Sequence, residues 1–260
     1  MLIQGDCIEV MKTFPEKSID LVICDLPFGT TASNWDKEIS LAELWEAYGR
    51  ILKDNGTILL FANGIFTAHV LCSNIVWYKY RWVWVKKNST NFVHAKNRPM
   101  TKSEDILVFS KGSMGHLSQL GDKRMTYNPQ GLIPINKIRK GGKGNFTDTL
   151  AGKRPSHKEE FLVEYTNYPC DVLTEFPEVA PNKKRHTNEK PVELLSYLIK
   201  TYSNEGETVL DNCMGSGSCG IACKETDRNF IGIELNEDYF LKAKEWIDSY
   251  KKSIQVRKLF

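Results

Sequence analysis

The sequence predicts an α/β fold in which helices cover a mostly parallel sheet. Strand-like and helix-like stretches alternate through residues 1–111, and the same alternation resumes after residue 190. The segment between them, residues 112–184, is rich in Gly, Pro, Asn, Lys and Arg and has no long apolar run. We therefore expect one α/β core, residues 1–111 and 185–260, interrupted by a loop-rich insertion, residues 112–184.

The expected core strands are short apolar runs that end at turn residues. Ser40 and Glu43 form a capping box that opens a helix expected over residues 41–53, and Asn55-Gly56 stops it. Pro191 suits the first turn of a further helix, whose apolar residues recur on one face. The expected strands are residues 2–4, 21–24, 57–62, 82–86, 105–110, 208–210 and 230–233. The last two expected helices are residues 216–224 and 237–250.

Composition narrows the class of protein. A chain of 260 residues can bury a substantial core, and a net charge of +3 says little about a polyanionic partner. The seven cysteines are scattered without zinc-ligand spacing, which predicts reduced thiols, no metal site and a cytoplasmic protein. Charged residues interrupt the amino terminus and no apolar run approaches 18 residues, so we expect neither a signal peptide nor a membrane span.

A carboxylate and an aromatic ring follow the apolar run at residues 19–24, in the sequence Asp25-Leu26-Pro27-Phe28. The carboxylate can accept a hydrogen bond from an amino group while the ring stacks on a flat base, which is how flipped-out bases are held. An ordinary strand-to-turn transition would have the same pattern, so these four residues alone leave both interpretations open.

A glycine-rich turn at residues 211–220 joins a strand to a helix, and Glu234 ends the next strand. Glycines allow a ligand to approach the backbone, and a terminal carboxylate can accept from ribose hydroxyls. A dinucleotide-binding domain fits formally, but only about forty residues follow Gly220, too few for its second half. Asp211 before the turn suits a cationic ligand better than pyrophosphate. A turn without any ligand is the remaining alternative.

Together the two stretches resemble the DNA amino-methyltransferases that use S-adenosylmethionine (SAM). The family's catalytic motif is Asp/Asn/Ser-Pro-Pro-aromatic, and its cofactor motif is Asp-Pro-Phe-x-Gly-Ser-Gly. Their order here, with the catalytic motif first, resembles the permuted β group. Three further stretches resemble family motifs in the expected places: Gly5-Asp6, residues 96–109 and residues 186–191. Leu26 replaces a proline of the catalytic motif, and Asn212-Cys213 replaces Pro-Phe of the cofactor motif.

The resemblance implies a Rossmann-like methyltransferase fold with a mostly parallel seven-stranded sheet, helices on both faces and one reversed edge strand. It also assigns two groups of site residues. The catalytic residues implied are Asp25, Leu26, Pro27 and Phe28. The SAM-binding residues implied are Asp6, Cys7, Lys190, Pro191, Asp211, Asn212, Met214, Gly215, Ser216, Gly217 and Glu234.

The implied activity is methylation of DNA at the N6 amino group of adenine, because an Asp opens the catalytic motif. Methylation of cytosine at N4 is one alternative. A catalytically silent relative that binds DNA or SAM is the other.

Basic residues in the insertion suggest phosphate contacts in a target-recognition region, although a solvated loop would have a similar composition. The candidate DNA-binding residues are Lys137, Arg139, Lys140, Lys143, Lys153 and Arg154. A homodimer and a cognate restriction enzyme are further partners that the resemblance allows.

Overall fold

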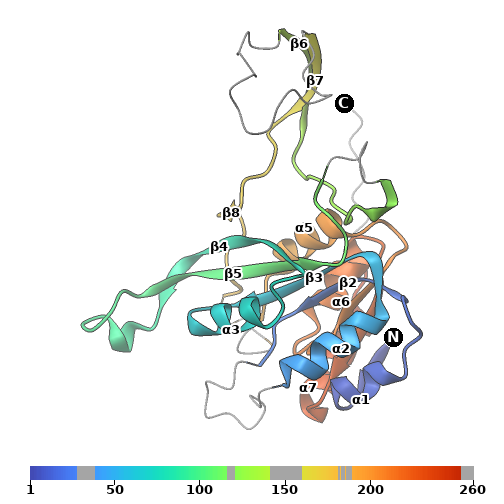
Figure 1. The fold of residues 1–260 in the computed structure, drawn as a ribbon. Coiled ribbons are helices and arrows are strands. Elements are labelled where there is room, and N and C mark those ends of the chain that lie inside the picture. The colour runs from blue at the N-terminus through green and yellow to red at the C-terminus, as the bar shows by residue number, and fades with distance from the viewer. Residues whose placement is uncertain are drawn as a thin grey trace. The chain divides into compact units, whose positions relative to one another are not determined.

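The computed structural model describes residues 1–27, 39–115, 121–140, 160–180, 182, 185 and 189–252 (Figure 1). The chain forms two compact units. The first consists of Met1–Asn128 and Asp171–Phe260, and the second of Pro129–Cys170. The second unit is therefore shorter than the insertion expected over residues 112–184. Met125 and Leu173, on either side of it, are buried in the core of the first unit.

The first unit is built on one eight-stranded sheet in which neighbouring strands are parallel except at β5, so the expected α/β fold is confirmed. The strands, in their order across the sheet, are β1 (Leu2–Gln4), β10 (Asn229–Glu234), β9 (Thr208–Asp211), β2 (Ile19–Cys24), β3 (Leu52–Ala62), β5 (Thr101–Ser110), β4 (Tyr78–Thr90) and β8 (Val172–Leu173). The strand beyond the expected seven is the two-residue β8.

The expectation of a reversed strand at the edge of the sheet is wrong. The reversed strand is β5, and it lies between β3 and β4 with antiparallel pairing on both sides. β4 and β5 form a hairpin, and the hairpin folds back so that its second strand pairs with β3. Local sequence marks a strand but not its neighbours, which is why its position could not be predicted.

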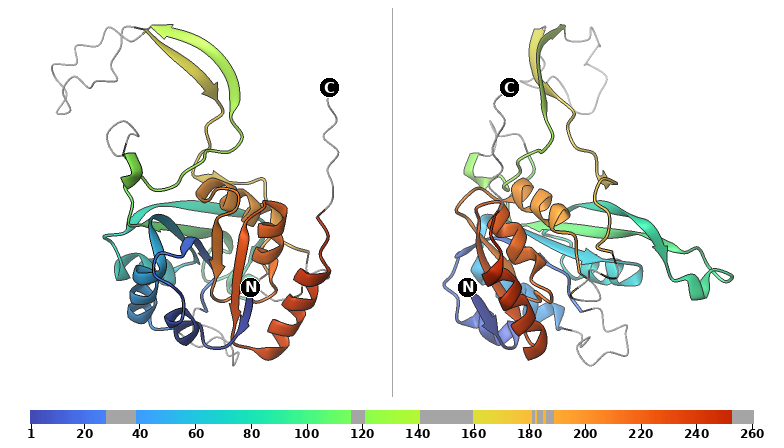
Figure 2. Two further views of the ribbon diagram at one scale, coloured as in Figure 1. Left: turned by 90° about the vertical axis from the view of Figure 1, so that its right-hand side faces the viewer. Right: turned by 180° about the vertical axis from the view of Figure 1, so that it is seen from behind.

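Helices cover both faces of this sheet (Figure 2). Strand β2 is buried on both sides, as central parallel strands are, with Val22 in one core and Leu21 in the other. On the first face lie α1 (Cys7–Lys12), α2 (Leu41–Ile51) and α3 (Ile65–Ser73). On the second lie α5 (Val192–Tyr202) and α6 (Ser218–Glu225). Helix α7 (Glu237–Ser249) packs beside α6, where Ile247 meets Gly220.

The tryptophans in the middle of β4 belong to the core. Trp82 and Trp84 are buried, and the indole N–H of Trp82 donates to the hydroxyl of Tyr202 at 2.5 Å. Two 3₁₀ turns, Phe92–His94 and Gly121–Lys123, follow β4 and β5 respectively. No helix in the described part of the chain is both long and apolar enough to cross a membrane.

The second unit contains a two-stranded antiparallel hairpin of β6 (Ile133–Lys140) and β7 (Glu160–Thr166). Loops were expected here from the sequence. All eight residues of β6 are exposed, so its mixed polar and apolar side chains give no one-sided alternation that would indicate a strand.

Candidate active site

Four parallel strands, β1, β10, β9 and β2, end along the same edge of the sheet. Gln4 lies opposite Glu234, and Asp211 lies opposite Gly232, so these strand ends are in register. The chain order reverses between β9 and β2, and ligands of open α/β sheets bind at the carboxyl ends beside such a reversal. Both sequence motifs, at residues 25–28 and 211–217, therefore begin at this edge.

Asp25 follows β2 and its two carboxylate oxygens have different surroundings. Oδ2 accepts from Nζ of Lys190 at 2.6 Å. Oδ1 is buried and has no hydrogen-bond partner among the described residues. A buried acceptor without a partner is costly. This oxygen is therefore free to accept a hydrogen bond from a ligand.

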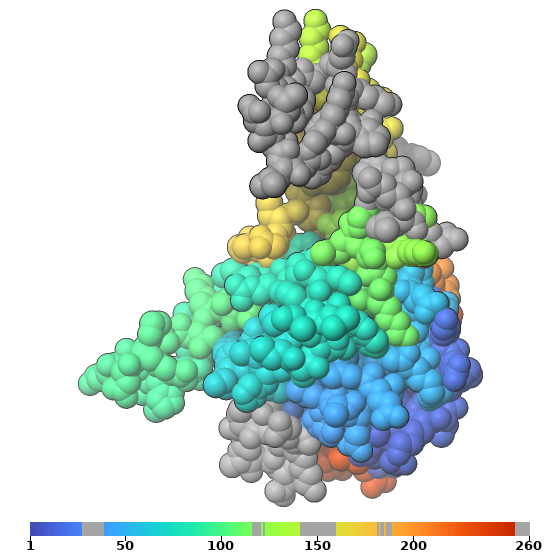
Figure 3. All heavy atoms as spheres, viewed as in Figure 1, coloured from blue at the N-terminus to red at the C-terminus, as the bar shows by residue number. Residues whose placement is uncertain are grey.

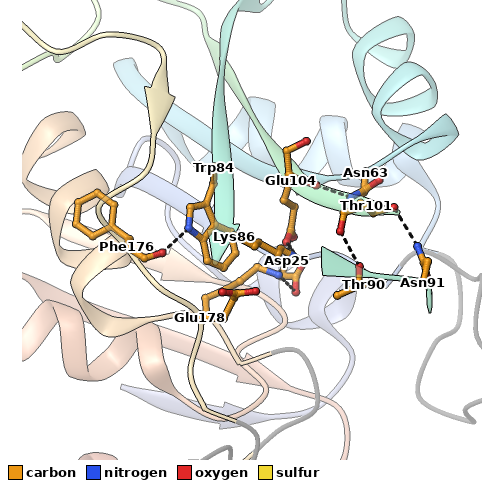
Figure 4. Close-up of polar contacts among 12 residues, drawn as sticks. Asp25, Asn63, Trp84, Lys86, Thr90, Asn91, Thr101, Glu104, Phe176 and Glu178 are labelled. Carbon is orange, nitrogen blue, oxygen red and sulfur yellow. Dashed lines mark hydrogen bonds and ion pairs between the residues drawn. The ribbon is translucent and has the colours of Figure 1, made fainter. Parts of the chain in front are cut away.

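Lys190 connects Asp25 to a second buried carboxylate. Its Nζ lies 2.9 Å from Glu104 of β5, and Glu104 also pairs with Lys86 of β4 at 2.7 Å. The ammonium group stands 4.8 Å from the ring centroid of Phe61. Figure 4 shows Asp25, Lys86 and Glu104 directed toward one another. The result is a chain of alternating charges, from Lys86 through Glu104 and Lys190 to Asp25.

The pKa values of this chain follow from burial and its ion pairs. Burial raises the pKa of Asp25 above its ordinary value, although the charge of Lys190 opposes this. Burial alone would also raise the pKa of Glu104, but Lys190 and Lys86 outweigh it and hold that pKa low. Burial would lower the pKa of Lys190, but the two carboxylates overcome it and raise that pKa. Lys190 is therefore a cation at neutral pH.

Leu26 and Pro27 turn the chain away from β2. The Leu26 side chain is buried in the core on the α2 face, which anchors the turn although the family's first proline is absent. Phe28, the expected stacking residue, lies outside the described residues.

The glycine-rich loop after β9 is tied to the end of β10. Gly215 has a positive φ of 48°, and its backbone N–H donates to Oε2 of Glu234 at 2.9 Å. The backbone N–H of Asn236 donates to Oε1 of the same carboxylate at 2.9 Å. Glu234 thus orders the loop, a contact that the sequence did not indicate.

The remaining predicted cofactor residues follow β1 or β9, except Lys190 and Pro191, which precede α5. Asp6 follows β1 and caps α1 by accepting from the backbone N–H groups of Ile8 and Glu9. Asn212 accepts from the hydroxyl of Tyr48 at 2.6 Å. The structure also places four further members of the predicted set: Cys7, Met214 and Ser216 are buried, and Pro191 is the N-cap residue of α5. Lys190 differs from them, because its amine is bound to Asp25.

Gly217 is expected to tolerate no side chain. Its φ is 82°, and an added Cβ would lie 2.9 Å from Cδ1 of Ile247 and 3.0 Å from Cβ of Ala243. Gly217→Ala should lower the free energy of unfolding by about 2–4 kcal/mol, through left-handed strain and overpacking together. Urea denaturation measures this. Gly206→Ala is the matched control, because Gly206 has a φ of 80° with no atom within 4 Å. Equal destabilisation of the two variants would show that the packing around Gly217 is unimportant.

Three carboxylates make this edge strongly acidic. The pKa of Asp211 is raised to about 8, chiefly by burial and to a smaller extent by the nearby charges of Asp25 and Glu234. Burial raises the pKa of Glu234 as well. A ligand with a positive charge and hydrogen-bond donors, such as the sulfonium and ammonium groups of SAM, would relieve this repulsion. The residues present therefore fit that cofactor.

The predicted DNA-binding residues fall into two groups. Lys137, Arg139 and Lys140 are exposed on β6 in the second unit. Lys143, Lys153 and Arg154 lie outside the described residues. Glu104 and Lys86, which complete the charge chain at Asp25, were not predicted. Glu104 could have been found from the sequence, because a charged residue at a buried position of an apolar strand indicates a charged partner.

Comparison with known proteins agrees with the fold and with the motifs. A sequence model of the DNA methylase family matches residues 19–245. The chain is 31% identical to the type II methyltransferase M.HpaI of Haemophilus parainfluenzae, over 95% of this chain and 74% of that protein. It is 26% identical to the DNA adenine methyltransferase YhdJ of Escherichia coli K12, over 92% of this chain and 79% of the relative.

A solved structure has the same fold. The crystal structure of an M1.HpyAVI–SAM complex aligns with a TM-score of 0.59 and 23% sequence identity, over 94% of this chain and 98% of that one. The family match spans both strand-end motifs and the helices between them. This chain therefore belongs to the DNA methylase family, the methyltransferases that act on exocyclic amino groups of DNA bases.

Proposed function

We propose that this protein transfers a methyl group from SAM to the N6 amino group of adenine in DNA, and that Asp25 holds the reacting nitrogen. The observation that carries this proposal is the buried Oδ1 of Asp25, which has no partner among the described residues. An exocyclic amino group is a donor of the right kind for this oxygen. The base reaches the site after it has been flipped out of the duplex.

Positioning and charge supply the catalysis. The amino nitrogen is a poor nucleophile because its lone pair is delocalised into the ring. Hydrogen bonds from the amino group to Oδ1 of Asp25 and to the Leu26 carbonyl favour a tetrahedral nitrogen with its lone pair exposed. When bound, SAM would supply the methyl group to this nitrogen and would leave as S-adenosylhomocysteine. The proton released from the nitrogen would pass to Oδ1 of Asp25, which already accepts its hydrogen bond, and from there to solvent.

Lys190 acts through Asp25. Its amine binds Oδ2 and thereby turns Oδ1 toward the base. Its charge also opposes the effect of burial on the pKa of Asp25, which favours the ionised, accepting form. Glu104 and Lys86 hold Lys190 in place from the neighbouring strands. These three are positioning residues.

SAM binding is expected to depend on pH through Asp211. The pKa of this carboxyl is raised to about 8, so it is mostly protonated at pH 7. A cationic ligand binds the ionised form, so affinity for SAM should rise with pH, by up to about tenfold per unit, and level off above about pH 8. Titration calorimetry in two buffers of different ionisation enthalpy should detect proton release at pH 7. In Asp211→Asn this release should vanish; its persistence would assign the proton to another group.

The reaction is tested by its product. The protein is incubated with labelled SAM and unmethylated DNA of varied sequence, and the digested nucleosides are identified by mass spectrometry. N6-methyladenine is expected. Detection of N4-methylcytosine would instead identify cytosine as the target base. SAM binding without any methylated base would contradict catalysis and favour a silent relative.

Partners beyond DNA are part of the same proposal. A relative named as a type II methyltransferase suggests that a restriction enzyme with the same target sequence accompanies this protein in the cytoplasm. Digestion of host DNA after loss of this gene would support that partnership. The homodimer is tested by sedimentation of the full chain.

A further inference from the structure

The hairpin of β4 and β5 extends beyond the sheet as an arm. We define the β4–β5 arm as residues 87–103, the part of the hairpin beyond Lys86 and Glu104. It projects away from the rest of the first unit in Figures 1 and 3. Every residue from Lys87 to Met100 is exposed. The surface of the arm is therefore accessible to a binding partner.

The arm is strongly basic. It carries four cationic side chains, Lys87, Lys96, Arg98 and Lys102, and contains no Asp or Glu. None of the four forms a salt bridge with another described residue. Glu178 contacts the start of the arm, where it accepts from the backbone N–H of Lys87 at 2.8 Å. Such unbalanced positive charge is complementary to a polyanion.

The tip of the arm combines this charge with exposed apolar side chains. Phe92 is 80% exposed and Val93 is 88% exposed. Backbone hydrogen bonds nevertheless order the turn, with His94 N–H donating to Asn91 at 3.0 Å and Ala95 N–H donating to Phe92 at 3.0 Å. Asn91 starts the turn with a φ of 66°, which asparagine tolerates. An ordered turn that displays an aromatic ring is suited to insertion into a groove.

The base of the arm is the candidate active site. Lys86 and Glu104 belong to the charge chain that ends at Asp25. Thr90 pairs with Thr101 beyond a register shift that begins at Val85. Thr90 is four positions beyond Lys86, so the tip begins within about 13 Å of the chain of charges. A duplex that delivers a flipped base to Asp25 would have its nearest groove within reach of this tip.

We propose that the β4–β5 arm is a second DNA-binding element, separate from the insertion. Its basic side chains contact phosphates, and Phe92 and Val93 enter the groove next to the flipped base. This inference rests on the proposed function, because the partner is the same duplex that supplies the base. The charge favours DNA over a second copy of the chain, since a basic surface repels its own copy.

Binding of a random-sequence duplex to the full chain tests the arm. The affinity of Lys96→Gln/Arg98→Gln is compared with that of wild type between about 50 and 200 mM salt. The slope of log affinity against log salt should become shallower by about 1.8, or about 0.9 for each phosphate that is no longer neutralised. Phe92→Ala should lower affinity roughly tenfold and leave the slope unchanged.

Two matched controls carry the same chemical changes elsewhere. Lys200→Gln/Lys251→Gln removes two exposed charges near the ends of α5 and α7, away from the acidic edge. Ile75→Ala removes an exposed apolar side chain after α3. Both controls should bind DNA as wild type does. All variants should bind SAM with unchanged affinity, which confirms that they are folded.

Three results would overturn the proposal. If the arm variants match their controls while wild type binds and methylates DNA, the arm does not bind DNA, and the proposed function is unaffected. If wild type neither binds nor methylates any duplex, both fail together. If Phe92→Ala instead converts a dimer to a monomer in sedimentation and leaves DNA affinity unchanged, the tip contacts a second copy.

Discussion

Asp25→Ala is expected to lower the rate of methyl transfer about a thousandfold while SAM still binds. The variant removes the acceptor Oδ1, the atom proposed to hold the amino group in the transition state. Loss of one such preorganised hydrogen-bonding group lowers turnover by about 10²–10³-fold. Because Asp25 also fixes the base relative to the methyl group, we expect a loss at the upper end of that range. Single-turnover transfer from labelled SAM measures the rate, and calorimetry measures SAM affinity.

Asp105→Ala is the matched control for that experiment. Asp105 is the neighbour of Glu104 on β5, and its carboxylate binds Thr67 and Arg81 on the other side of the strand. Its loss should leave the methyl-transfer rate within a few-fold of wild type. Retained transfer in Asp25→Ala would remove Asp25 from the reaction, and an equal loss in both variants would point to general disruption of the sheet.

Lys190→Met is expected to cause the largest loss of stability. The Lys190 side chain is 11% exposed and neutralises two carboxylates, so its removal leaves Asp25 and Glu104 facing each other at a buried site. Breaking a buried ion pair from one side costs about 3–5 kcal/mol in the free energy of unfolding. Without Lys190 the folded-state pKa of Asp25 rises further above its ordinary value. The difference in the free energy of unfolding between wild type and Lys190→Met should therefore become smaller as the pH falls toward that ordinary value, because the folded variant then takes up a proton at Asp25.

Two further variants test the cause of that loss. Lys244→Met breaks a pair of the same 2.6 Å length with Asp248, but both side chains are more than half exposed. It should cost no more than about 1 kcal/mol. Lys190→Met/Glu104→Gln removes one of the stranded charges and should recover part of the stability. If the double variant is less stable than Lys190→Met, repulsion between the carboxylates does not explain the loss. Urea denaturation measures all three.

The local parts of the site were predictable from sequence because each is continuous in the chain. Asp25 follows a mostly apolar strand, and the Gly215–Gly217 turn joins a strand to a helix. The order of the strands in the sheet could not be predicted in this way. Nothing near β5 indicates that it pairs with β3 on one side and with β4 on the other, since pairing depends on how the hairpin folds back.

The charge chain at Asp25 was missed for the same reason. Glu104 lies within a stretch that resembles a family motif, but its partners depend on register across three strands and on the entry to α5. Lys190 was predicted as a cofactor residue, and only the packing of α5 against the sheet brings its amine to Asp25. Long-range pairing of buried charges leaves no periodic signal along the chain.

The position of β1 has a consequence for the order in which the molecule is assembled. Its neighbour is β10, and the N–H of Gly232 donates to the carbonyl of Met1, so among the described strands β1 pairs with one that is synthesised some 225 residues later. β2 likewise cannot pair with β9 until β9 has been synthesised, whereas its other neighbour, β3, is synthesised soon after β2. On the ribosome, the half of the sheet that carries Asp25 can form while the half that carries the glycine loop is still absent. The edge of β2 stays open until β9 is synthesised, so the cofactor site cannot form before β9 and β10 join the sheet.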